Sequence, residues 1–205
     1  MSNALKRKKK KMEPLGYSKS ELLNMQKYAR EKENTDRLIR EAYWNVRLIA
    51  YQLLHDDFGY GNKRINKVEQ AIDQYLISAE KGELTQKKIQ YVLKSQWNID
   101  VLGTTDKIPF RQLFALVGEE KLSQGTGMCI LASIASYLAL LGVCLKTKMK
   151  MSANSIRRLY DRIRYYIDSI ATGYETMVGV ASVLFCTRNV SIAIRDLSGS
   201  FMRFK

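Results

Sequence analysis

Arginine and tyrosine side chains are concentrated in the short segment from Arg157 to Tyr166. If this segment is a helix whose apolar positions Ile156, Leu159 and Ile163 face a core, an outward face remains at the spacing i, i+4, i+7. Guanidinium groups bind phosphate through paired N–H donors, and a tyrosine ring stacks on nucleobases. The pattern therefore predicts a surface that binds nucleic acid or a partner. Its candidate residues are Arg157, Arg158, Arg162, Arg164 and Tyr165, joined by Lys146, Lys148 and Lys150 from the preceding loop.

The same helix has a purely structural interpretation. Asp161 and Asp168 stand four residues after Arg157 and Arg164. Ion pairs at the i, i+4 spacing would make this an ordinary solvated face. Both interpretations are open at the level of sequence.

The chain as a whole is basic. It has 34 Lys and Arg residues against 20 Asp and Glu, a formal net charge of +14, which attracts nucleic acid, acidic proteins or anionic lipid. Lys8, Lys9 and Lys10 belong to a basic run in the predicted disordered arm, residues 1–16, which is either a nucleic-acid-binding tail or a solvated arm. Met12 and Glu13 follow the run where a secretory signal would have an apolar segment.

Catalytic and metal-binding patterns are scarce. Gln124 and Cys129 have a spacing that suggests a cysteine nucleophile, but a thiolate needs a histidine base and the chain has a single histidine, His55, far upstream. The three cysteines show no C-x-x-C spacing, and no phosphate-binding glycine loop occurs. We expect a protein that is not an enzyme, has no cofactor and no metal, and works in the reducing cytoplasm of a bacterial host.

The chain resembles itself. Shifting it by 91 positions without a gap aligns residues 17–102 with residues 108–193, and places Gly82 on Gly173 and Thr85 on Thr176. The coincidences fall on turn residues and on apolar positions with helical spacing, as in a duplicated helical unit. The alternative is a chance match between helical segments of like composition. The duplication predicts an all-α fold of two tandem, divergent four-helix units, residues 17–102 and 108–194, with a linker at 103–107 and a tail at 195–205.

Capping residues and apolar periodicity define the expected helices of the first unit. They run from Ser18 to about Lys32, from Asn34 or Thr35 to His55, over residues 65–79 with Gly82 as the stop, and from Thr85 to Asn98.

In the second unit the expected starts are Pro109, Thr126, Ser155 and Thr176, and Gly173 ends the third helix. The short pieces 99–102 and 190–194 look extended and are predicted to pair as a small β-ribbon.

The segment from Gly125 to Leu145 carries no charge and is long enough to span a bilayer. Its counterpart in the first unit, residues 34–54, is charged, so a shared fold favours a helix buried in the core or in an oligomer interface. A homo-oligomer through the second unit and a membrane-associated protein that inserts residues 125–145 are the two alternatives to a soluble binding protein.

The turn from His55 to Arg64 has the order histidine, acidic pair, Phe-Gly-Tyr-Gly, then basic residues. It resembles a turn in small helical proteins encoded by phages and prophages of Gram-positive bacteria. The similarity covers residues 43–101 and implies a mobile-element origin. Phe58 and Tyr60 either staple the corner or dock onto a protein partner.

Together these features predict a phage-type protein whose basic helical surfaces bind nucleic acid or a host ribonucleoprotein or nuclease. A regulator or inhibitor of host defence, an anti-CRISPR-like protein, fits this description.

Overall fold

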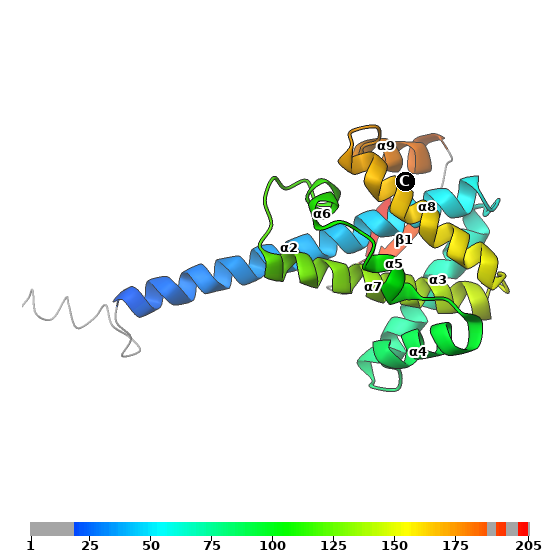
Figure 1. Ribbon diagram of the computed structural model, residues 1–205, viewed down its shortest axis with the longest axis horizontal. Helices are drawn as coiled ribbons and strands as arrows, with labels where there is room; N and C mark the ends of the chain where they lie inside the picture. The colour runs from blue at the N-terminus through cyan, green and yellow to red at the C-terminus, as the bar shows by residue number, and fades with distance from the viewer. Residues whose placement is uncertain (1–18, 188–191, 196–200, 205) are drawn as a thin grey trace, which may run out of the picture. The chain divides into compact units, whose positions relative to one another are not determined.

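The computed structural model describes residues 19–187, 192–195 and 201–204, and Figure 1 shows the order of their elements. The fold is all-α, as predicted, with one short strand pair. The chain divides into two units, residues 1–37 and residues 38–205. The predicted arm, with Lys8, Lys9 and Lys10, lies outside the described residues.

Helix α2 spans Lys19–Asp56 without a break, so the prediction of two helices meeting at Asn34 or Thr35 is wrong. No glycine or proline occurs between Gly16 and Gly59, and capping residues alone do not end a helix that has no other reason to stop. The Asn34 side chain instead accepts a hydrogen bond from the guanidinium of Arg37, 3.0 Å away on the next turn.

Helices α3 (Asn62–Glu80) and α4 (Gln86–Trp97) match the predicted third and fourth helices. Gly82 has φ +74°, a left-handed conformation in which its N–H reaches the carbonyl of Ala79 and closes the end of α3. Thr85 caps α4, because its hydroxyl accepts from the N–H of Lys88 at 3.3 Å. Turn and capping residues were therefore sufficient to predict the ends of these two helices.

The prediction of an extended piece at 99–102 and a linker at 103–107 is wrong, because Val101–Thr105 forms helix α5. Asp100 starts it by accepting a hydrogen bond from the N–H of Gly103 at 3.0 Å. The Lys94 ammonium, 2.8 Å away, and that N–H hold the pKa of the Asp100 carboxyl below its usual value.

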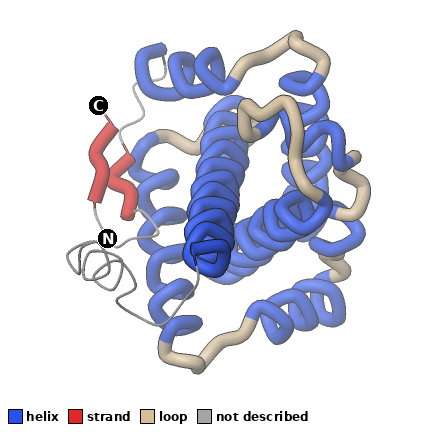
Figure 2. Tube along the Cα trace, turned by 90° about the vertical axis from the view of Figure 1, so that its left-hand side faces the viewer, coloured by secondary structure: helices blue, strands red, loops and turns tan. Residues whose placement is uncertain are grey.

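The predicted ribbon is only half correct. Strand β1 (Ile192–Arg195) overlaps the expected strand, but it pairs antiparallel with β2 (Phe201–Phe204), which lies in the predicted tail. Ile192 stands opposite Phe204 and Arg195 opposite Phe201. Figure 2 shows the two strands, in red, beside the helices, and β1 contacts α3.

The second half contains α6 (Phe110–Leu116), α7 (Gln124–Thr147), α8 (Ala153–Ala171) and α9 (Met177–Ser182), the last running into a π-helical segment, Val183–Thr187. The predicted starts of α7 at Thr126 and of α8 at Ser155 are wrong by three residues. Ser123 caps α7 by accepting a hydrogen bond from the N–H of Thr126, and Ser152 caps α8 by accepting one from the N–H of Ser155. Thr176 caps α9 as predicted, and Gly173 ends α8 with φ +79°.

Several helix bounds recur at the offset of 91 residues. Asn62–Glu80 becomes Ala153–Ala171, and the ends of α2 and α7, residues 56 and 147, differ by the same amount. The two halves nevertheless contribute to one hydrophobic core, which includes Ile49 and Ile72 from the first half and Leu141 and Ile163 from the second. Residues 17–102 and 108–194 therefore do not have separate cores.

Helix α7 lies at the centre of this core. It contacts α3, α4, α5 and α8, and every residue from Tyr137 to Gly142 is buried. Among the described helices α7 has the length and composition of a membrane span, but 61% of its apolar window is covered by the fold. This burial supports the prediction of a core helix.

A charged pair crosses the core between α2 and α3. Arg47 and Glu69 are each 2% exposed, and Nε of Arg47 donates to Oε1 of Glu69 at 2.7 Å and to the Tyr51 hydroxyl at 3.1 Å. The guanidinium also lies 5.8 Å from the centre of the Trp44 ring. Because either charge alone would be stranded in a low-dielectric core, the two residues must be present together.

Removing one partner tests this pair. Glu69→Gln should lower the free energy of unfolding by about 3 to 5 kcal/mol, whereas Arg47→Met with Glu69→Leu should recover most of it. Urea unfolding followed by circular dichroism gives both values. Glu31→Gln, which breaks the exposed Lys27–Glu31 pair, is the control and should cost less than about 0.5 kcal/mol. An equal effect of the two Glu→Gln changes would contradict a buried pair.

The contact between α7 and α8 gives a second test. A methyl group on Gly142 would overlap the Tyr160 hydroxyl, which donates to the carbonyl of Leu138. Gly142→Ala should therefore destabilise the protein by about 1 to 3 kcal/mol, and adding Tyr160→Phe should recover part of the loss. Gly125→Ala, at an open position of the same helix, should be neutral or stabilising. Equal melting temperatures for the two alanine variants would show that α8 does not approach Gly142.

Candidate nucleic-acid interface

Helix α8 has the two faces that the sequence predicts. Ile156, Leu159 and Ile163 are buried, whereas Arg158 is exposed and Tyr165 is 59% exposed on the outward side. Since Arg158, Arg162 and Tyr165 follow one another at i, i+4 and i+7, they form a row along the helix about 10 Å long.

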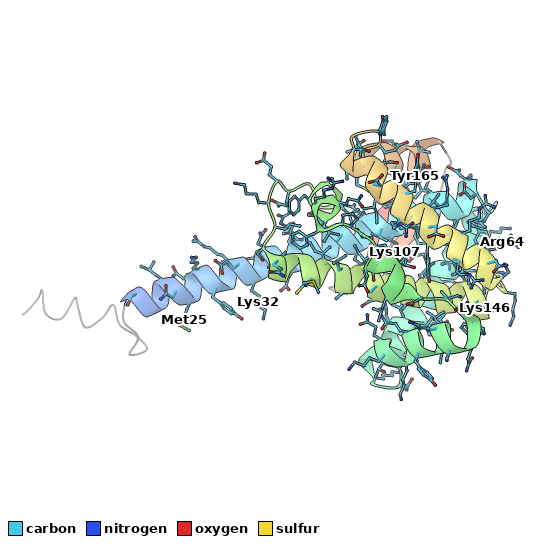
Figure 3. All side chains as sticks on the ribbon, in the orientation of Figure 1. Met25, Lys32, Arg64, Lys107, Lys146 and Tyr165 are labelled. Carbon is cyan, nitrogen blue, oxygen red and sulfur yellow. The ribbon has the colours of Figure 1, made fainter. Side chains whose placement is uncertain are left out.

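Five basic residues lie on the last turn of α7, the connection that follows it and the first turns of α8, and we call them the basic corner. The end of α4 supports the corner from one side: Nζ of Lys146 lies 6.0 Å from the centre of the Trp97 ring, and Nη1 of Arg157 donates to the carbonyl of Asn98 at 3.0 Å. Figure 3 labels Lys146 at the end of α7. The basic corner consists of Lys146, Lys148, Lys150, Arg157 and Arg158.

The predicted ion pairs of α8 form differently. Arg157 donates to the Asn98 carbonyl and to the Asn154 side chain and does not pair with Asp161. Asp161 lies 3.7 Å from Arg164 at the i, i+3 spacing instead. Asp168, the other expected partner, accepts a hydrogen bond from the Gln112 side chain of α6.

Arg162 is held in place by a residue far away in the sequence. Its Nε donates to the Asp57 carboxylate at 3.0 Å, and its guanidinium lies 5.5 and 5.8 Å from the ring centres of Tyr165 and Tyr166. Burial raises the pKa of Tyr166, the inner ring of the two. Arg162 therefore orients the exposed Tyr165 ring, and its own charge is partly neutralised.

Three cations of the surface have no such partner. Among the described residues, Lys148, Lys150 and Arg158 make no ion pair or side-chain hydrogen bond, and all three are exposed. Lys150 also has φ +56°, a left-handed conformation that costs a side-chain-bearing residue about 1 to 2 kcal/mol. The turn thus has a lysine where glycine would be less strained.

The aromatic turn packs mainly against the core. Tyr60 is 5% exposed and Phe58 is half-buried, so of the two roles predicted for them the structure supports the staple at the corner. The Arg64 guanidinium covers the Tyr60 ring at 5.0 Å. His55 pairs with its neighbour Asp56, at 2.8 Å.

Two pockets of the described surface could not be predicted from the sequence. One, of 320 Å³, lies along α4, where it is lined by Lys87, Lys94 and the 72% exposed Tyr91. The other, of 290 Å³, adjoins Tyr165 and includes Lys107 and Gln112. Both bring together residues from different elements, and no local pattern marks such a meeting.

The cysteines show no reactive environment in the described structure. Cys144 is buried, and burial raises the pKa of its thiol to about 12. Cys129 is exposed on α7. Within the described ranges no group of three His, Cys, Asp or Glu side chains could hold a metal ion.

Comparison with family models, with curated proteins and with solved structures gives no match to this chain.

The left-handed backbone of Lys150 allows a test of whether this side chain stabilises the fold or only supplies a surface charge. Lys150→Gly relieves the strained φ, so the free energy of unfolding should stay the same or rise by up to about 1 kcal/mol. Lys148 has φ −91°, and Lys148→Gly as the matched control should lose about 0.5 to 1 kcal/mol. A destabilised Lys150→Gly variant in thermal unfolding would show that the lysine side chain supports the fold.

Proposed function

We propose that this protein binds nucleic acid, free or within a ribonucleoprotein, through the basic corner and the adjoining row on α8. The observation that carries the proposal is the group of exposed, unpaired cations, Lys148, Lys150 and Arg158, the last of which shares a face of α8 with the exposed Tyr165 ring. Two acidic residues close to this row, Asp57 and Asp161, are each paired with an arginine.

The chemistry of the row suits a single strand. Unpaired lysine and arginine side chains neutralise phosphates, and a solvent-facing tyrosine gives a base a platform on which to stack. A duplex keeps its bases stacked on each other and would leave Tyr165 unused. We therefore expect single-stranded DNA or RNA to bind more tightly than the duplex of the same sequence.

The positive net charge of the protein limits how it could act against host defence. A protein that filled the nucleic-acid channel of a nuclease would need an acidic surface, because such channels are basic. A basic protein can instead bind the guide or target strand that the ribonucleoprotein presents. The proposed anti-CRISPR-like activity would then depend on the same basic residues.

We also propose that the halves of the chain are diverged copies of one helical unit. The support is the common offset of helix bounds and the matching ends, Gly82 with Gly173 and Thr85 with Thr176. On this proposal the basic turn, residues 148–152, corresponds to the turn at residues 57–61, which contains Asp57. Only the second copy would have lysines within this turn.

A salt series tests the proposed function. For the triple variant Lys148→Ala, Lys150→Ala, Arg158→Ala, the affinity for a labelled single strand should fall at least about tenfold. The slope of log affinity against log salt should become shallower by about 2, because three phosphate contacts are lost. Fluorescence anisotropy between about 50 and 200 mM salt gives both quantities.

The control removes the same charge elsewhere. Lys81, Lys88 and Lys121 are exposed, and their replacement by alanine should change the affinity less than about threefold. If both triple variants lose affinity equally, the binding depends only on net charge and the proposed surface is wrong. Failure of the unaltered protein to bind at low salt would refute the proposal altogether.

A further inference from the structure

The pocket beside Tyr165 contains a buried acceptor that has no donor. Gln112, from α6, is 6% exposed; its Nε2 donates to the Asp168 carboxylate of α8, and its Oε1 is buried without a hydrogen-bond partner among the described residues. A buried acceptor left unpaired destabilises the fold, so native proteins rarely keep one unless a ligand or water can satisfy it.

The other pocket residues differ from Gln112 in exposure and charge. Lys107 comes from the connection between α5 and α6 and is exposed, and Arg164 is half-buried on α8. Figure 3 labels Lys107 and, on α8, Tyr165. Asp161 and Asp168 supply two carboxylates at the same pocket. The pocket thus combines acceptors, an aromatic ring and two cations in 290 Å³.

A ligand for this pocket needs hydrogen-bond donors on one edge, a flat face and an attached anion. A nucleotide has all three, and the pocket volume suits one base. Among the bases, guanine presents two neighbouring N–H donors, N1–H and the N2 amino group, which one carboxylate can accept together. Uracil and thymine flank their single N–H with carbonyl oxygens, which a carboxylate repels.

We propose that the pocket holds one unstacked guanine of a single-stranded nucleic acid. Asp168 and the Oε1 of Gln112 accept from the Watson–Crick edge of the base, Tyr165 stacks on its face, and Lys107 with Arg164 binds the adjoining phosphate. This inference rests on the proposed function and adds base preference to it. The basic side chain of a peptide would also find carboxylates here, but Lys107 and Arg164 would repel it.

The experiment compares two labelled single strands on the full chain: oligothymidine, and the same strand with one central guanine. The guanine strand should bind roughly tenfold more tightly, the discrimination typical of a two-bond contact to a base edge. Asp168→Asn should remove most of this preference and change oligothymidine binding less than about threefold. Tyr165→Ala should weaken the binding of both strands, because the ring stacks on either base. Asp106→Asn, an exposed carboxylate outside the pocket, is the control and should keep the preference.

The outcomes separate this inference from the function on which it rests. Equal affinity for the two strands, with the basic-corner variant still defective, would overturn the guanine pocket and leave the proposed function standing. No binding of either strand would overturn both. Competition by a tetra-arginine peptide that disappears in Asp168→Asn would identify the pocket as a peptide site and overturn the inference. Thermal unfolding of each variant excludes loss of fold, and Tyr165 is exposed enough to be replaced without unfolding.

Discussion

The burial of α7 is the constraint on which the rest of the structure depends. From Gln124 to Leu145 this helix has no charged residue, and its second half, from Ile134 to Leu145, is largely buried and must be covered by other elements. Helices α3, α4, α5 and α8 do this, each with its apolar side inward. Their polar sides then face solvent, and the first charge after the apolar run of α7 is Lys146, where the basic corner begins. The basic corner is a consequence of how the core is closed.

The Arg47–Glu69 pair is the exception to an apolar core, and its surroundings explain how it is tolerated. The pair has the Tyr51 hydroxyl and the Trp44 ring as neighbours, so the guanidinium keeps several favourable contacts. Two apolar side chains could slide past each other at this point, whereas two charges that must meet fix the position of α3 along α2.

Local patterns predicted the elements whose ends are set by a single residue. Gly82, Thr85, Gly173 and Thr176 mark helix ends through backbone conformation and capping, which act within a few residues. The outward row of α8 could be predicted from the periodicity of apolar residues, which is likewise a local pattern. The hydrogen-bond partners of Arg157 and Arg162 could not be predicted in this way, because Asn98 and Asp57 are distant in sequence and are brought to α8 by packing. Long-range packing likewise buries Tyr60 and places Gln112 against Asp168, and no local pattern records either.

The connections α2–α3 and α7–α8 are both five residues long, yet one contains Asp57 and the other Lys148 and Lys150. A connection of this length between two helices can therefore contain either sign of charge. Such a corner is an evolvable position: new binding partners can be acquired there by point substitution, without insertions and without repacking the interior. Variation among relatives of this chain should accumulate first in these two connections.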